Sequence, residues 1–140
     1  MQMAQIPNNY LALDVGSKRI GVALASSVAR MPHPLVTIDA QSDVRSQLQR
    51  IIADETIGHM VVGLPRGLNG QDTEQTAAVR TFVAELELLG LPVYVQDEAL
   101  TSVKAKAELH ERGGSYAKGD VDALAATYIL EDFLANQATH

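Results

Sequence analysis

The chain has 140 residues, of which 46% are hydrophobic, and this length and composition suit one compact domain with a sizeable buried core. It has no cysteine, which excludes disulfide scaffolds, thiolate metal sites and cysteine nucleophiles. The formal net charge of −6 argues against a nucleic-acid-binding protein with a basic surface throughout, but a local basic patch is compatible with that sum.

The two ends of the chain are predicted to be short tails. The opening MQMAQIPNNY lacks a basic segment followed by a long apolar one, so we expect a tail over residues 1–9 and no signal peptide. No run of about 18 apolar residues occurs, so we expect no contact with a membrane and a cytoplasmic location. We predict one domain over residues 10–136 and a C-terminal tail over residues 137–140.

A β-hairpin is the first predicted element. Residues 10–16 and 19–26 are apolar segments joined by a short turn, and the second alternates large and small side chains with the period of a strand. A third strand is expected around residues 35–38, because the prolines of the preceding MPHP stop a helix and favour an extended entry.

A helix and a buried strand follow the hairpin. Residues 43–56 carry apolar side chains at helical spacing, with Ser42 or Asp43 available as the N-cap. Residues 60–65, MVVGLP, are apolar on both alternating faces, as in a strand that helices cover on each side. This strand is therefore expected at the centre of a sheet.

A second helix is predicted over residues 73–89. Asp72 is its expected N-cap, with Gln75 three positions later completing a capping pattern, and Gly90 ends the helix. The next segment, PVYVQ over residues 92–96, is typical of a strand and leads into an acidic pair.

The predicted order of elements defines the fold class. Two more helices, over residues 101–114 and 120–136, give the order βββαβαβαα. An antiparallel three-strand meander followed by two parallel strands implies a mixed five-stranded α/β sheet with helices on both faces. This layout resembles ribonuclease H-like domains, whereas flavodoxin-like domains begin with βαβ.

Carboxylates lie at three places that this fold can bring together. Asp14 projects from the end of the first strand, and Asp97 and Glu98 end the last strand, at the edge where open α/β sheets bind ligands. Asp122 falls on the apolar stripe of the final helix, where a carboxylate needs a partner. Such a hard-oxygen set suits Mg²⁺ or Mn²⁺, although each aspartate alone is more often a cap, turn or ion-pair residue.

Three cations are candidates for contact with phosphate. Lys18 and Arg19 follow Asp14 closely, which suits a phosphate contact, while solvated hairpin cations are the alternative. Arg66 stands in GLPRGLNG, a loop that lacks the lysine and hydroxyl residue of a P-loop.

Four motifs in order carry a resemblance to a known family. They are LALDVGSKRIGVALA, VVGLPRGLNG, VYVQDEALTS and DVDALAATYIL, and together they span about residues 10–134. In this order and spacing they resemble the YqgF/RuvX family, the Holliday junction resolvase-like branch of the ribonuclease H superfamily.

The resemblance implies an activity and a site. It implies Asp14, Glu98 and Asp122 as the catalytic acidic triad and as ligands of two divalent ions, Mg²⁺ or Mn²⁺, with Lys18 and Arg19 beside them on the substrate. The implied reaction is phosphodiester hydrolysis, with precursor 16S ribosomal RNA as substrate and its 5′ end as the place of maturation. Nucleic acid and the small ribosomal subunit are the expected partners of a monomer or homodimer.

Alternatives to this function remain open at the level of sequence. Branched DNA is the second candidate substrate, and a nucleotide-binding ATPase of the actin-like class would need a second lobe that 140 residues do not supply. A non-catalytic RNA-binding assembly factor is the third interpretation. It draws on Ala99, which stands where the family usually has arginine and so removes a bidentate phosphate partner.

Overall fold

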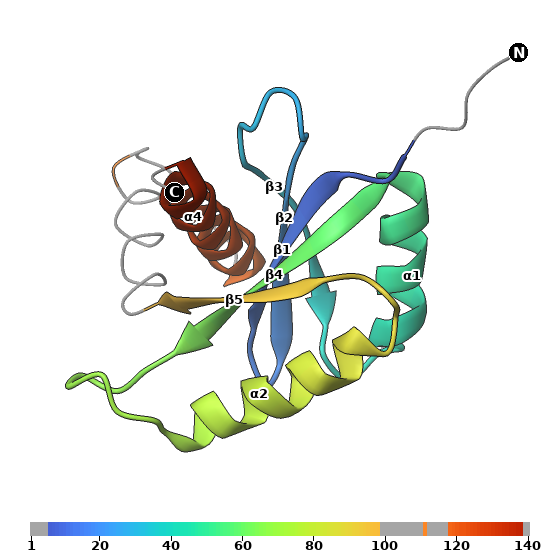
Figure 1. The fold of residues 1–140 in the computed structure, drawn as a ribbon. Coiled ribbons are helices and arrows are strands. Elements are labelled where there is room, and N and C mark those ends of the chain that lie inside the picture. The colour runs from blue at the N-terminus through green and yellow to red at the C-terminus, as the bar shows by residue number, and fades with distance from the viewer. Residues whose placement is uncertain (1–5, 99–110, 112–117, 139–140) are drawn as a thin grey trace, which may run out of the picture.

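The computed structural model describes residues 6–98, 111 and 118–138. The helix expected over residues 101–114 and the substitution at Ala99 lie outside the described residues, apart from the helical Glu111. The described elements, in chain order, are β1 Asn9–Val15, β2 Arg19–Ala25, β3 His33–Asp39, α1 Val44–Asp54, β4 Ile57–Pro65, α2 Glu74–Glu87, β5 Val93–Glu98 and α4 Lys118–Ala138 (Figure 1).

The five strands form one mixed sheet in the order β3-β2-β1-β4-β5. β1 pairs antiparallel with β2, and β2 with β3, whereas β4 pairs parallel with both β1 and β5. This arrangement confirms the predicted meander followed by two parallel strands. β4 is paired on both sides and so is interior as expected, although β1 is the middle strand.

Helices cover both faces of the sheet (Figure 1). α1 and α2 pack on one face over the large side chains of β1, β2 and β4, and α4 packs on the other face. Small residues of the sheet lie under α4. The alternation of each strand therefore separates two cores, of which the α4 side contains Tyr10, Ala12, Ala23, Ala25, Val61, Ala126, Ile129, Leu130, Phe133 and Leu134.

Two glycines allow α4 to approach the sheet closely. A Cβ at Gly21 would lie 1.9 Å from the backbone oxygen of Asp122, and a Cβ at Gly63 would lie 2.3 Å from Cδ1 of Ile129. A larger residue at Gly21 would meet the backbone of the helix and force it to move, whereas one at Gly63 would meet the side chain of Ile129. The sequence of β2 thus fixes where the first part of α4 lies.

Strand limits differ modestly from the predictions. β3 begins at His33 and includes Pro34, which an edge strand tolerates because one side of its backbone needs no partner in the sheet. β4 begins at Ile57, three residues before the predicted start. None of the helices in the described part of the chain is long and apolar enough to cross a membrane.

The caps of α1 and α2 test two specific expectations. Asp43 caps α1 and accepts from the backbone N–H of Ser46, as one of the two candidates predicted. For α2 the prediction of Asp72 was wrong, because Thr73 is the N-cap and forms a reciprocal capping box with Thr76. Asp72 instead binds the guanidinium of Arg66.

Candidate active site

Asp14 occupies the next-to-last position of β1 and faces α4. Its Cα is paired with that of Gly21, and Tyr10 and Ala12 on the same face of the strand pack against α4. Burial raises the pKa of the Asp14 carboxyl to about 6, with a further contribution from the neighbouring charge of Asp122. The structure therefore brings two of the three predicted carboxylates, Asp14 and Asp122, close enough to repel each other.

Asp122 lies in the first part of α4, where the backbone of the helix touches Gly21. The Nε of Arg19 donates to Oδ2 of Asp122 at 2.6 Å. The expectation that a carboxylate on this apolar stripe requires a partner is confirmed, and the partner is the residue that begins β2.

Glu98 ends β5 on the α4 face of the sheet. Gln96 on the same face of the strand accepts a hydrogen bond from Asn136 of α4, and alternation places Glu98 on that face and Asp97 on the other. Asp97 binds Arg66 instead. The two members of the acidic pair, adjacent in sequence, therefore lie on opposite faces of the sheet.

The three carboxylates share an edge and a face but do not form one cluster. β4 lies between β1 and β5, so the backbones of Asp14 and Glu98 are separated by two strand spacings, about 10 Å, across the sheet, and Glu98 lies further along its strand than the position level with Asp14. In the described ranges, 6–98, 111 and 118–138, no group of three or more acidic or histidine residues is close enough to hold one metal ion. The structure gathers Asp14 with Asp122, and Glu98 remains across β4.

A hollow lies beside Arg19, the residue that binds Asp122. It measures about 500 Å³ and is lined by Lys18, Arg19, Thr37, Asp39 and Gln41. Lys18 is exposed at the turn between β1 and β2, and its backbone oxygen accepts from the N–H of residue 40. Both hairpin cations therefore lie at the edge of the sheet where β1 ends, close to Asp14.

Arg66 braces a loop. Its guanidinium binds Asp72 and, with Nη2 at 3.2 Å, Asp97. Within the same loop the N–H of Gly67 donates to the backbone oxygen of Gln71 at 2.8 Å. These contacts tie the segment after β4 to β5, on the face of β5 opposite to that of Glu98. Contact of Arg66 with phosphate stays a prediction.

Gln75 is a site-supporting residue that sequence reasoning assigned to a cap. Its Nε2 donates to the backbone oxygen of Val15 at 2.9 Å, so the start of α2 is tied to the residue that follows Asp14. The contact spans 60 positions in sequence. No local pattern could have indicated it.

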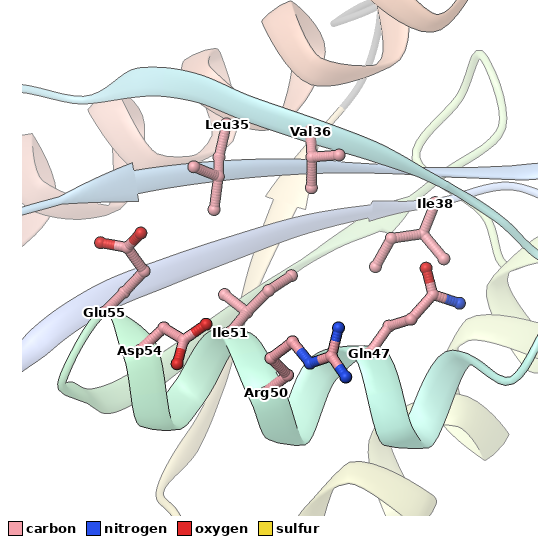
Figure 2. Close-up of a pocket in the computed structure, with 8 residues that line it drawn as sticks. All are labelled: Leu35, Val36, Ile38, Gln47, Arg50, Ile51, Asp54 and Glu55. Atoms are coloured by element: carbon pink, nitrogen blue, oxygen red, sulfur yellow. The ribbon is translucent and has the colours of Figure 1, made fainter.

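Another pocket, of about 320 Å³, lies away from these residues. Figure 2 shows Leu35, Val36 and Ile38 of β3 facing Ile51 of α1, with polar side chains of the helix at the rim. It lies between β3 and α1, across the sheet from α4. The pocket is therefore not part of the carboxylate site.

This sheet order, with carboxylates at the strand edge and on the helix that covers it, defines a ribonuclease H-like α/β protein. The RuvX family model, described as Holliday junction resolvase, matches residues 8–136. The chain belongs to the RuvX family.

Curated relatives agree with this assignment. A protein of Chloroflexus aggregans named "Putative pre-16S rRNA nuclease" is 42% identical over 129 residues, covering 89% of this chain and 91% of the relative. A protein of the same name from Thiobacillus denitrificans is 38% identical over 99% of both chains.

The fold is also similar to that of two resolvases. RuvC of T. thermophilus, in complex with a Holliday junction substrate, aligns with a TM-score of 0.54 at 16% identity and covers 94% of this chain and 96% of RuvC. The Fowlpox virus resolvase, in complex with Holliday junction DNA, aligns with a TM-score of 0.57 at 8% identity over 95% and 100% of the two chains. At these identities the likeness concerns the fold.

Proposed function

We propose that this chain is a cytoplasmic, metal-dependent nuclease that hydrolyses phosphodiester bonds during 5′-end maturation of precursor 16S ribosomal RNA. The observation that carries the proposal is the pairing of Asp14 with Asp122 at the strand edge, where burial and mutual repulsion raise the pKa of Asp14. The names of the family relatives support the substrate.

The donor chemistry of the site fits a divalent cation. Asp14 and Asp122 offer carboxylate oxygens, the ligands that Mg²⁺ and Mn²⁺ prefer, and their mutual repulsion is relieved by a positive ion. We infer that these two residues hold the ion and that Glu98 serves the same site from across β4. When bound, such an ion activates water and neutralises charge that develops on the phosphate.

The chain's own cations would bind the substrate. Lys18 and Arg19 line the hollow beside the carboxylates, and a phosphate there would accept hydrogen bonds from both side chains. Phosphate contacts position a nucleic acid without reading its sugar or sequence, so this hollow suits RNA and DNA alike.

Branched DNA is the second candidate substrate. The family description and the junction-bound RuvC and Fowlpox resolvase structures favour it. A direct comparison separates the two: a 5′-leader precursor RNA and a four-way DNA junction, each incubated with the protein in Mg²⁺ or Mn²⁺. Cleavage of the RNA alone supports the first proposal, and cleavage of the junction alone replaces it by the second.

A matched pair of variants tests the site. Asp14→Asn should abolish cleavage while the fold is retained, whereas Asp120→Asn, an exposed carboxylate in the first turn of α4, should retain it. RNA binding by the wild-type protein without cleavage in either metal would instead favour the assembly-factor alternative.

A further inference from the structure

The ion pair between Arg19 and Asp122 occupies an atom that the proposed function needs. The Nε of Arg19 lies 2.6 Å from Oδ2 of Asp122, and their side chains are 38% and 18% exposed. A carboxylate oxygen that accepts this short, charge-assisted hydrogen bond has less electron density to offer a metal ion. Arg19 and a divalent cation therefore compete for the same carboxylate.

The neighbouring carboxylate, Asp14, forms no comparable ion pair with the residues that the structure describes. Burial raises the pKa of Asp14, with a smaller contribution from the charge of Asp122. Among the described residues, the ion pair at this edge is thus made by Asp122 and not by Asp14. A cation that binds both aspartates through Oδ2 of Asp122 would compete with Arg19 for that oxygen.

We propose that Arg19 is an exchangeable counter-ion, which holds Asp122 while no divalent ion is bound and moves to a substrate phosphate when the ion takes Asp122. This inference rests on the proposed function and deepens it. Arg19 is then first a positioning residue, which holds Asp122 until the metal binds, and afterwards a binding residue for the substrate.

The surroundings of Arg19 make the exchange physically accessible. Partly exposed ion pairs are weak, so a divalent cation can displace the guanidinium at little cost. The released side chain already lines the hollow that it shares with Lys18. Its planar fork is well suited to two phosphate oxygens, which a substrate would bring to that hollow.

A purely structural role is the alternative. Arg19 joins the start of β2 to α4, and an ion pair that only fastens the helix would affect the unfolding temperature without a specific effect on metal affinity. Lys18 provides the matched control, because it is the adjacent cation and Lys18→Gln removes the same charge from the same turn. Any difference between the two variants therefore reports the contact with Asp122 and not the net charge.

The experiment measures Mn²⁺ binding to the full chain by calorimetry and by the electron paramagnetic resonance signal of free Mn²⁺. We expect Arg19→Gln to tighten Mn²⁺ binding about fivefold relative to wild type, the change expected when a competing pair of about 1 kcal/mol is removed. Lys18→Gln should change it by less than about twofold, as expected for an exposed charge screened by salt. Thermal unfolding checks that both variants are folded.

A second readout follows the released guanidinium. Fluorescence anisotropy gives the affinity for the 5′-leader RNA, with Ca²⁺ replacing Mn²⁺ so that bound RNA is not cut. Wild type should gain affinity when Ca²⁺ is added, because Arg19 becomes available to phosphate, and Lys18→Gln should start from a lower affinity, since it lacks one proposed phosphate ligand, and show the same gain. Arg19→Gln should lose most of that gain.

Three outcomes would overturn the proposal. Equal Mn²⁺ affinities of Arg19→Gln and Lys18→Gln would show a general charge effect, and weaker Mn²⁺ binding by Arg19→Gln would show that Arg19 prepares Asp122 for the metal. An unchanged Ca²⁺ effect on RNA binding in Arg19→Gln would exclude the transfer to phosphate. Failure of every variant to bind Mn²⁺ would contradict the proposed metal-dependent activity itself, and so differs from these results.

Discussion

A Cβ atom at Gly21 would lie 1.9 Å from the backbone oxygen of Asp122, so α4 rests on β2 at a point where a side chain cannot exist. Gly21 is also the antiparallel partner of Asp14. One small residue therefore determines both how closely α4 packs and how near the two aspartates lie.

Gly21→Ala should destabilise the protein by about 3 kcal/mol, because the methyl group meets backbone and the helix must shift. Urea unfolding measures the loss. Gly67→Ala is the control, since the atoms nearest to its added Cβ belong to the flexible side chain of Gln71, and we expect a cost below about 1 kcal/mol. Equal costs for the two variants would contradict the close packing of α4 on β2.

Much of the fold could be predicted because its signals are local. Strand alternation and helical spacing indicated the elements, and the apolar run of β4 indicated a strand covered on both sides. The cap of α2 was missed because Asp72 and Thr73 are both good capping residues. The choice between them depends on Arg66, which binds Asp72 from the end of another element.

The site was predictable in part for the same reason. The place of Asp122 on an apolar stripe showed that it needs a partner, but Arg19 is 103 positions away in sequence and no spacing rule identifies it. To decide whether Glu98 or Asp97 lies on the same face of the sheet as Asp14, one must know which side chains of β5 face α4. The hydrogen bond between Gln96 and Asn136 of α4 shows this.

The side chain of Thr73 should account for the N-terminal stability of α2. Thr73→Ala removes the acceptor for the N–H of Thr76 and should cost about 1 kcal/mol of unfolding free energy. Asp72→Asn leaves this cap intact and weakens an exposed ion pair with Arg66, so it should cost less than about 0.5 kcal/mol. Chemical denaturation measures the unfolding free energy of both variants. A larger loss in Asp72→Asn than in Thr73→Ala would indicate that Asp72 is the N-cap.

Asp14 should titrate near pH 6 in the metal-free protein, because burial disfavours its charged form and Asp122 repels it. Carbon-detected NMR of the carboxyl group measures this pKa. Asp122→Asn should lower the pKa only in part, since burial is the larger cause and persists. A wild-type pKa at or below the ordinary 3.8 would contradict the burial of Asp14 beside Asp122.

The raised pKa of Asp14 has a consequence for stability with a definite sign. The folded protein holds the Asp14 proton more tightly than the unfolded chain. Protonated Asp14 therefore adds to the free energy of unfolding, and this contribution is fully present below about pH 4 and is lost as the pH rises through about 6. Asp14→Asn should therefore stabilise the metal-free protein at pH 8 by up to about 3 kcal/mol and change it little at pH 4. Urea unfolding at the two pH values measures both effects, and an equal effect at pH 4 and pH 8 would exclude ionisation of Asp14 as the cause.

Gln75 should affect cleavage more than stability. Its Nε2 fixes the backbone oxygen of Val15, the residue after Asp14, and a small displacement of a catalytic carboxylate reduces the rate strongly. Gln75→Ala should lower the cleavage rate about tenfold while RNA affinity stays within about twofold, and should cost about 1 kcal/mol in unfolding free energy. Gln47→Ala on α1, whose side chain bonds within its own helix cap, should leave the rate unchanged. If Gln75→Ala cleaved at the full rate without a hydrogen bond to Val15, the sheet and α4 alone would hold Asp14 in place.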